Sequence, residues 1–500
     1  MAAARVSPLV AALDAAAEAR PDAPAVSEGA ASTRWTYAEL ADASRAVSSW
    51  LRGPGGVRPG DRVVLRIGNR MAFAALYYGV LRAGAVAVPL SPEMRPYLLA
   101  AVLADAQPRV VVHQEDETGR GLEAARACGA VLATSDMLLA SPARRGAGET
   151  DVAVAPDSVG QLIYTSGSTS TPKGVVCTHT QVDFAARAIG ARLGYRPDDV
   201  VLGLLPLSFD YGLYQLLLSV AAGAELVLGE ATVPTRALAL LRSRRATVVP
   251  VVPSLAAMLV RLVARGELPR HVRLFTNTGA ALPQQCIEAL RAGFPGAAVV
   301  AMYGITECKR VTIGEPDGDL LRPGSVGRPL PGTSVRIVDA DGAGLPAGQL
   351  GEIVVSGPHV MSGYWGAPEL TAQRFRHDPT TGASTLHTGD YGRLDEEGHL
   401  YFAGRRDDQF KRRGVRTSST EIEGAALDIA GVTAAAALPP RDGLDLRLAV
   451  TASLTADEVL VELGRRLESA KVPSSCVLLE SFPLTANGKI DRKALHALRF

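Results

Sequence analysis

The sequence lacks every cysteine pattern that would point to a metal site or a disulfide scaffold. Its 500 residues include five cysteines, and no two of them form a C-x-x-C pair. Zinc-binding spacings and a disulfide framework are therefore excluded. We expect buried thiols in a reducing compartment at the five positions, Cys128, Cys177, Cys286, Cys308 and Cys476.

The chain also lacks an excess of charge of either sign. Its 52 basic residues are balanced by 51 acidic residues, so the formal net charge is only +1. A protein that binds nucleic acid through a broad basic face needs much more positive charge. We therefore expect no nucleic-acid partner.

Long apolar runs are missing as well. No stretch of roughly eighteen uncharged apolar residues occurs, so the sequence predicts no membrane span. Residues 1–24 place Asp14 and Glu18 inside an apolar helical period, which indicates an amphipathic helix ending before Pro21 rather than a signal peptide. The resulting expectation is a cytoplasmic protein with no membrane partner.

What the sequence has instead is an alternation of short β-branched runs with helical stretches. Residues 62–67 and 85–90 are typical of strands, and a helical stretch follows each of them. Such alternation predicts an α/β fold with largely parallel sheets. Over about 323–403, apolar and polar residues alternate between Gly, Pro and Asp turns, which predicts antiparallel strands in a small β-barrel or β-layer.

The final segment predicts a second domain. It alternates strand and helix again, and it is long enough for a small separate core. We therefore predict an N-terminal domain over 1–405 and a C-terminal α+β domain over 406–500, with a hinge near Asp407.

A short loop suggests a ligand. "YTSGSTSTPKGV", Tyr164–Val175, combines glycine, several hydroxyls and Lys173, a composition that suits a polyphosphate. It is not a Walker loop, because the lysine precedes Gly174 instead of following a glycine. A Ser/Thr-rich linker is the alternative for this segment taken alone.

Seven motifs, in order along nearly the whole chain, resemble those of the adenylate-forming superfamily, which includes acyl- and aryl-CoA ligases, amino-acid adenylation domains and luciferases. They are "LRAGAVAVPL", "YTSGSTSTPKGV", "NTGAAL", "MYGITE", "HTGD", "GRRDDQFKRRGVR" and "PLTANGKID". The resemblance implies a large N-terminal domain of two α/β subdomains plus a small β-barrel, and a small mobile C-terminal domain. It also implies ATP and Mg²⁺, and two half-reactions: a carboxylate attacks the α-phosphate of ATP, and a thiol then captures the acyl-adenylate.

The resemblance implies catalytic roles for three residues. Lys489 corresponds to the lysine that bridges carboxylate and α-phosphate, Glu307 to the magnesium ligand, and Thr306 to a hydrogen-bond donor for the α-phosphate. Taken alone, Lys489 would be an ordinary exposed lysine in an Asn-Gly turn. Asp407 corresponds to the hinge about which the small domain swings between the two half-reactions.

The nucleotide site implied by the resemblance draws on four motifs. Tyr303 would stack on adenine, although a buried core tyrosine is the plain alternative, and Asp390 would accept the ribose hydroxyls. The full set is Thr165, Ser166, Gly167, Ser168, Thr169, Lys173, Gly279, Ala280, Ala281, Tyr303, Gly304, Asp390 and Arg405. One departure is Ser170, which replaces the usual second glycine of the phosphate loop.

The acyl pocket is expected around "PLSFDYGLYQLLLSVAAG". Amino-acid-activating members carry F-D-x-S, whose Asp pairs with the substrate ammonium; here Phe209 and Asp210 match, and Gly212 replaces the Ser. The alternative is that Asp210 caps the helix beginning at Tyr211. The adjacent cations Lys309 and Arg310 would meet an acidic group or face solvent. The expected pocket residues are Phe209, Asp210, Tyr211, Tyr214, Thr276, Thr278, Met302, Arg310 and Val311.

The acceptor thiol is either a carrier protein's phosphopantetheine or coenzyme A. "QFKRRGVR", which includes Lys411 and Gly414, resembles the K-x-R-G-x-R of adenylation domains that serve carriers, and no carrier segment is present. We therefore expect activation of a small amino acid and its transfer to a separate carrier protein in natural-product biosynthesis. An acyl- or aryl-CoA ligase and an inactive nucleotide-binding scaffold are the alternatives.

Overall fold

Most of the chain is described by the computed structural model of the protein. The described residues are 6–29, 33–94, 96–114, 120–140, 151–165, 172–230, 234–263, 268–377, 384–405, 409–412, 415–441, 444–467, 469, 471–485 and 490–497.

A six-stranded sheet is built from the first strand–helix repeats. Its strand order is β6-β5-β3-β4-β7-β8, and all neighbours are parallel except β7 and β8. Strands such as β3 are apolar on both faces, as a parallel sheet covered by helices requires. The strands are β3 (Arg62–Arg66), β4 (Val86–Pro89), β5 (Val110–His113), β6 (Val131–Thr134), β7 (Val159–Thr165) and β8 (Lys173–Thr178).

A nine-stranded sheet forms the second layer. Its order is β15-β14-β13-β12-β11-β9-β10-β1-β2, and the run from β13 to β1 is parallel. The strands are β1 (Pro24–Glu28), β2 (Arg34–Thr36), β9 (Val200–Gly203), β10 (Glu225–Leu228), β11 (Val248–Val251), β12 (Leu274–Asn277), β13 (Ala298–Tyr303), β14 (Thr312–Ile313) and β15 (Arg328–Pro329).

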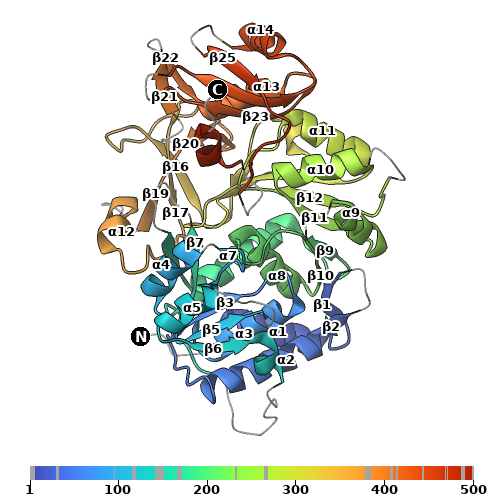
Figure 1. The fold of residues 1–500 in the computed structure, drawn as a ribbon, viewed down its shortest axis with the longest axis vertical. Helices are drawn as coiled ribbons and strands as arrows, with labels where there is room; N and C mark the ends of the chain where they lie inside the picture. The colour runs from blue at the N-terminus through green and yellow to red at the C-terminus, as the bar shows by residue number, and fades with distance from the viewer. Residues whose placement is uncertain are drawn as a thin grey trace.

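Helices separate and cover these two sheets (Figure 1). One continuous apolar core contains residues of both sheets together with α1, α2, α3, α7 and α8, so these helices form the layer between them. Thr36 and Thr178 start α2 and α7 with reciprocal capping boxes. The helices of this domain are α1 (Pro8–Ala19), α2 (Tyr37–Arg52), α3 (Met71–Arg82), α4 (Pro96–Ala106), α5 (Arg120–Ala127), α6 (Ser135–Leu139), α7 (His179–Leu193), α8 (Asp210–Ala222), α9 (Pro234–Ser243), α10 (Pro253–Val263), α11 (Gln284–Gly293), η1 (Gly318–Leu320) and α12 (Pro368–Arg374).

An antiparallel sheet of five strands follows, where the alternating pattern predicts it. β19 is its longest strand and pairs with β17, β18 and β20. The strands are β16 (Ser334–Val338), β17 (Gly351–Ser356), β18 (Phe375–His377), β19 (Ser384–Leu394) and β20 (Leu400–Arg405).

The C-terminal segment has its own apolar core, built around a three-stranded sheet of order β23-β24-β25. Figure 1 shows this sheet at the opposite end of the long axis from the six-stranded sheet, next to β20 and α11. Its elements are β21 (Gln409–Arg412), β22 (Val415–Ser418), α13 (Ser419–Leu427), β23 (Val432–Leu438), β24 (Arg447–Ala452), α14 (Ala456–Arg466), β25 (Ser475–Leu478) and α15 (Arg492–Ala497).

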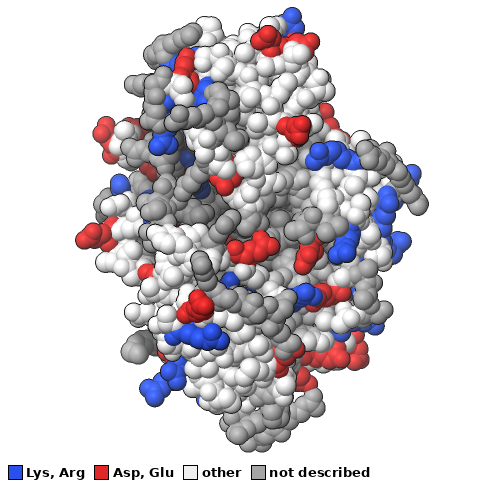
Figure 2. Space-filling model, viewed as in Figure 1, with Lys and Arg blue, Asp and Glu red and all other residues white. Residues whose placement is uncertain are grey.

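The surface and the helix lengths agree with the composition. Figure 2 shows acidic and basic side chains interspersed on the face it draws, as a net charge of +1 allows. Within the described residues, no helix combines the length and apolarity needed to cross a bilayer. The thiol prediction is wrong in part, because Cys128 is exposed and Cys286 and Cys476 are half-buried, while Cys177 and Cys308 are buried.

Candidate active site

The predicted site residues gather where several strands end. β11, β12 and β13 run parallel, so the segments that follow β12 and β13 leave the same edge of the nine-stranded sheet. Open α/β sheets bind ligands at this carboxyl edge. Gly279 to Ala281 follow β12 and are exposed, with Gly279 at a φ of 84°.

The loop after β13 folds tightly back on itself to reach β14. Val311 N–H donates to the Tyr303 carbonyl at 2.8 Å, which closes the loop. A Cβ on Gly304 would lie 1.9 Å from the Lys309 carbonyl oxygen, so only glycine fits there. Lys309 itself has a left-handed φ of 59°, which is uncommon for a residue other than glycine. This loop, residues 304–310, carries Thr306 and Glu307 as well as Lys309 and Arg310.

A buried charge cluster joins this loop to α8. Lys309 Nζ lies 2.7 Å from Asp210 Oδ1, and Arg310 Nη1 lies 3.5 Å from Asp210 Oδ2. The side chain of Lys309 is 0% exposed, that of Arg310 is 5% exposed and that of Asp210 is 6% exposed. Burial alone would lower the pKa of Lys309, but the Asp210 carboxylate outweighs it and holds that pKa above its ordinary value. Lys309 is therefore a buried ammonium ion at physiological pH.

This cluster answers both questions that the sequence leaves open at Asp210. The capping alternative is wrong, because Phe209 is the N-cap, Asp210 is the first residue of α8, and its carboxylate bonds Lys309 and Arg310. Lys309 and Arg310 face this acidic group and not solvent. The Ser of the F-D-x-S pattern is absent for a steric reason: a Cβ on Gly212 would lie 2.2 Å from the Pro206 carbonyl oxygen.

Aromatic residues of α8 complete the cluster. The Arg310 guanidinium lies 4.8 Å from the Tyr211 ring centre, and Lys309 Nζ lies 5.8 Å from that of Tyr214. The Tyr211 hydroxyl contacts the Thr276 carbonyl at 2.6 Å and the Thr276 hydroxyl at 2.7 Å. Met302 and Val311 are buried nearby on β13 and beside β14.

Several buried polar atoms around this cluster lack a partner in the described part of the chain. They are the Tyr214 hydroxyl, the Thr278 hydroxyl and Arg310 Nε. A buried polar atom without a hydrogen bond is costly, so these atoms favour a ligand or water beside them.

Asp390 lies on β19 at the expected ribose position. It is 2% exposed, accepts a hydrogen bond from the Tyr303 hydroxyl at 2.8 Å, and lies 3.4 Å from Arg405 Nε. Burial raises the pKa of Asp390, although Arg405 and Tyr303 oppose this shift. The Tyr303 ring is stacked on Phe402, with 5.5 Å between centroids. This is the buried core position that we gave as the alternative to stacking on adenine. The adenine-stacking role of Tyr303 stays a prediction.

Two residues that the sequence does not single out hold the stretch of β19 just before Asp390. Arg374, at the end of α12, donates to the carbonyls of His387 and Thr388. Glu352 of β17 accepts from the Gly389 amide at 3.0 Å and lies 3.2 Å from His387 Nδ1.

The phosphate loop lies mostly outside the described residues. Thr165 and Lys173, its two ends, are paired across β7 and β8. Lys173 Nζ lies 5.9 Å from the Tyr364 ring centre, and the Tyr364 hydroxyl donates to Glu307 Oε1 at 2.6 Å. The predicted residues outside the description are Ser166, Gly167, Ser168, Thr169, Ser170, Asp407, Gly414 and Lys489.

Glu307 has the chemistry expected of a magnesium ligand. One of its carboxylate oxygens is held by Tyr364, while the other has no hydrogen-bond partner in the described part of the chain. Those residues contain no group of three or more potential metal ligands. Mg²⁺ commonly binds through one or two carboxylates together with substrate phosphates, so a single available carboxylate oxygen linked through Tyr364 to Lys173 fits it.

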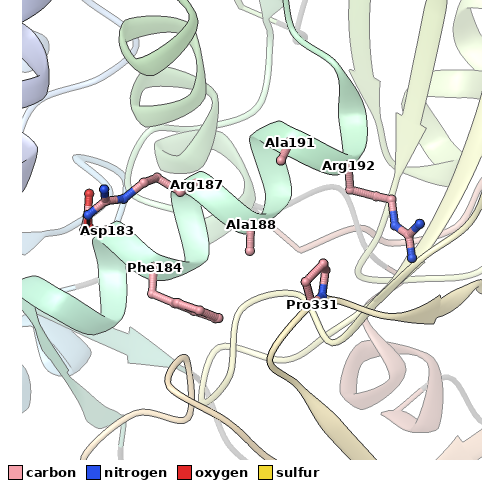
Figure 3. A pocket seen from close by; sticks show the side chains of 7 residues that line it. All are labelled: Asp183, Phe184, Arg187, Ala188, Ala191, Arg192 and Pro331. Carbon is pink, nitrogen blue, oxygen red and sulfur yellow. Dashed lines mark hydrogen bonds and ion pairs between the residues drawn. The ribbon is translucent and has the colours of Figure 1, made fainter.

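A separate hollow of about 510 Å³ lies along α7. Figure 3 shows α7 side chains on one wall and Pro331 on the other. Its lining residues are Asp183, Phe184, Arg187, Ala188, Ala191, Arg192 and Pro331, and none of them belongs to the predicted site.

Comparison with known proteins agrees with the fold and the motifs. The family model described as AMP-binding enzyme matches residues 13–365. AmbB, an antimetabolite synthetase of Pseudomonas aeruginosa, is 34% identical over 491 residues, which cover 96% of this chain and 38% of AmbB. The chain thus spans about two fifths of that relative's length.

Two solved structures are also similar. VinN is 46% identical with a TM-score of 0.73, covering 80% of this chain and all of the VinN chain, and a complex of VinN with L-aspartate matches at 44% identity with a TM-score of 0.72. ATP-bound MatB from Rhodopseudomonas palustris is 28% identical with a TM-score of 0.88, covering 99% of both chains. These matches confirm the α/β fold class, and the chain belongs to the AMP-binding enzyme family, within the adenylate-forming superfamily that its motifs resemble.

Proposed function

We propose that the protein catalyses ATP-dependent adenylation of an amino acid that carries a second carboxylate, an aspartate-like acid. The observation that carries this proposal is the buried cluster of Asp210, Lys309 and Arg310. The acyl group then passes to the phosphopantetheine thiol of a separate carrier protein.

The charge of the cluster supports this substrate class. One carboxylate and two cations give a formal charge of +1 in a nearly dry pocket, and Arg310 Nε is unpaired in the described part of the chain. The ammonium of a simple amino acid would raise this formal charge to +2, whereas an added second carboxylate would hold it at +1. A substrate with both an ammonium and a second carboxylate pairs with the aspartate on one side and the cations on the other.

Lys309 can take part in this pairing without leaving Asp210. An ammonium group has three donors; Asp210 accepts one of them, and Cys177 is a second side-chain hydrogen-bond partner. The third donor and the planar guanidinium of Arg310 suit a carboxylate. The VinN complex with L-aspartate, at 44% identity, supports the same substrate class.

A dicarboxylic acid without an ammonium is the second candidate. After one carboxylate has been adenylated, the other would neutralise the formal charge of +1 in the pocket. It would leave Asp210 paired with Lys309, as in the structure. Succinate as a test substrate separates this candidate from the first.

The proposed roles at the nucleotide follow the resemblance to the adenylate-forming superfamily. Asp390 and Arg405 bind the ribose, and Lys173 with the loop 166–169 binds phosphates. Glu307 would hold Mg²⁺, which would neutralise phosphate charge. The substrate carboxylate oxygen forms a bond to the α-phosphorus while the bond to the bridging oxygen breaks, and pyrophosphate leaves.

Lys489 completes the proposed first half-reaction. Its ammonium lowers the repulsion between the two anions as they meet. For the second half-reaction, the resemblance of "QFKRRGVR" to the loop of carrier-serving domains supports a carrier thiol over coenzyme A. Side-by-side incubation with coenzyme A and a holo-carrier protein tests this choice, and thioester formation on coenzyme A alone would contradict it.

Substrate-dependent ATP–pyrophosphate exchange tests the first half-reaction. L-Aspartate, L-asparagine, succinate and 3-aminopropanoate form a panel in which each analogue removes one charge. Loss of a partner from a buried charge pair costs about 2–5 kcal/mol, so each analogue should lose at least about thirtyfold in kcat/KM. Equal exchange with asparagine would refute the second-carboxylate proposal, and equal exchange with succinate would favour the dicarboxylic acid.

A matched pair of variants tests whether the preference for aspartate over asparagine depends on Arg310. Arg310→Gln should weaken the preference for aspartate over asparagine, because it removes one of the two cations beside Asp210 and leaves Lys309. Arg322→Gln removes an arginine from a surface ion pair with Glu397 and should leave that preference unchanged.

A further inference from the structure

A short strap ties the loop 304–310 to the strand that carries Lys173. The strap is residues 361–365, "MSGYW". Met361 N–H donates to the Glu307 carbonyl at 2.9 Å, and Trp365 N–H donates to the Gly174 carbonyl at 2.8 Å. Between them, Tyr364 forms an antiparallel bridge with Val175 of β8. The backbone therefore fixes Tyr364 between two segments that are far apart in sequence.

The Tyr364 side chain contacts the functional group of each segment. Its hydroxyl donates to Glu307 Oε1 at 2.6 Å, and its ring centre lies 5.9 Å from Lys173 Nζ. The ring is held edge-on against Phe375, with 5.6 Å between centroids, and the Tyr364 amide donates to the Thr371 hydroxyl at 2.9 Å. With 8% of its surface exposed, Tyr364 has little freedom to move.

The chemistry of the phenol suits this place. A tyrosine hydroxyl carries its proton at neutral pH, so the Tyr364 hydroxyl donates it to the Glu307 carboxylate. A phenol that donates to one carboxylate oxygen fixes the plane of that carboxylate. The face of the same ring attracts the lysine ammonium.

We propose that Tyr364 is a positioning residue for the metal and phosphate groups. Its hydroxyl holds Glu307 Oε1 so that the other oxygen is presented to Mg²⁺, and its ring keeps Lys173 beside the same site. This inference rests on the proposed function for the roles of Glu307 and Lys173. Partners that orient a metal ligand typically contribute ten- to hundredfold to metal affinity.

The test separates the hydroxyl from the ring. Tyr364→Phe removes the hydrogen bond and keeps the ring, whereas Tyr364→Leu removes both. Binding of Mn²⁺ in the presence of α,β-methylene-ATP, followed by electron paramagnetic resonance, reports the metal site without turnover. We expect about ten- to hundredfold weaker Mn²⁺ binding in Tyr364→Phe, and a further loss of nucleotide affinity in Tyr364→Leu.

Kinetics provide a second readout. Pyrophosphate exchange by Tyr364→Phe should need about ten- to hundredfold more Mg²⁺ for half-maximal rate and should approach the wild-type rate when Mg²⁺ is saturating. A residue that serves only packing would lower the rate at every Mg²⁺ concentration. The Mn²⁺ titration needs no acid substrate, so it can be read even if every acid fails in the exchange assay.

Tyr401→Phe is the matched control. Tyr401 also contacts a carboxylate, Asp395 Oδ2 at 3.3 Å, and also has a cation over its ring, Arg393 at 4.2 Å. This variant should bind Mn²⁺ and use Mg²⁺ as the wild type does. Wild-type Mn²⁺ affinity and Mg²⁺ dependence in a folded Tyr364→Phe protein would overturn the proposal.

Discussion

Removing Lys309 should lower the free energy of unfolding of the wild-type protein and raise that of the Asp210→Asn variant. The lysine charge stabilises the fold only while the Asp210 carboxylate is ionised beside it. Lys309→Met keeps the length of the side chain and leaves the aspartate with Arg310 as its only charged partner among the described residues, at 3.5 Å instead of the lysine's 2.7 Å. Asp210→Asn is the reciprocal change, and it leaves two neighbouring buried cations without an anion.

The distances set the scale of both effects. At an effective dielectric constant near 20, unit charges 2.7 Å apart attract by about 6 kcal/mol, and those 3.5 Å apart by about 5 kcal/mol. Desolvation offsets part of this attraction, and breaking a buried pair costs about 3–5 kcal/mol overall. Asp210→Asn should reach the upper end of that range, whereas Lys309→Met should stay near its lower end, since an Asp–Arg pair remains.

The double variant Asp210→Asn/Lys309→Met tests the ion pair directly. In the Asp210→Asn background, Lys309→Met removes one of two like charges, so it should raise the free energy of unfolding by about 1–3 kcal/mol instead of lowering it. Urea unfolding and calorimetry on the four proteins give the coupling energy. The coupling should persist in high salt, because buried charges are screened only weakly. An equal loss of stability from Lys309→Met in both backgrounds would refute the ion-pair reasoning.

Two further predictions concern a glycine and two histidines. Gly212→Ser should lower the free energy of unfolding by more than about 3 kcal/mol or prevent folding, since its Cβ would overlap the Pro206 carbonyl. Gly464→Ala in α14 has nothing near its Cβ and should raise the free energy of unfolding by about 0.5–1 kcal/mol. Thermal unfolding measures both changes. Burial lowers the pKa of His179 and of His359 to about 4. Unfolding restores a pKa near 6.5, so the unfolded state binds more protons below that pH, and each histidine should remove about 3 kcal/mol of stability as pH falls from 6.5 to 4. Replacing either by glutamine should flatten that part of the stability–pH curve, and an unchanged slope in both variants would contradict the assignment.

Local sequence patterns were sufficient for most of the fold. The runs at 62–67 and 85–90 form β3 and β4 because fully buried parallel strands are apolar on both faces. The helix expected before Pro21 is α1, which ends at Ala19. The motifs also identified Asp390, which lies on β19, Glu307, which lies in the loop after β13, and Asp210, which begins α8.

The side chains that contact Asp210 and Glu307 were harder to predict from the sequence. Asp210 and Lys309 are 99 residues apart, and nothing local to either indicates that they form a pair. Tyr364 reaches Glu307 over 57 residues, through a strap whose pairing with β8 has no sequence signature. Such contacts depend on how the sheets pack, which periodicity does not specify. The pair Lys309-Arg310, which follows Glu307 after Cys308, was the one available signal, and the sequence did not show whether this pair is buried or exposed to solvent.

The loop 304–310 limits which substitutions can change the acid preference of such an enzyme, in evolution or by redesign. Position 304 accepts no side chain, and position 309 has a φ of 59° that glycine, asparagine and aspartate adopt most readily. Arg310, which we propose selects the acid, and Glu307, which is expected to hold the metal, therefore share one constrained turn. A library that varies Arg310 and Asp210 and leaves 304–309 intact should retain more catalytically competent members than one that randomises the whole turn.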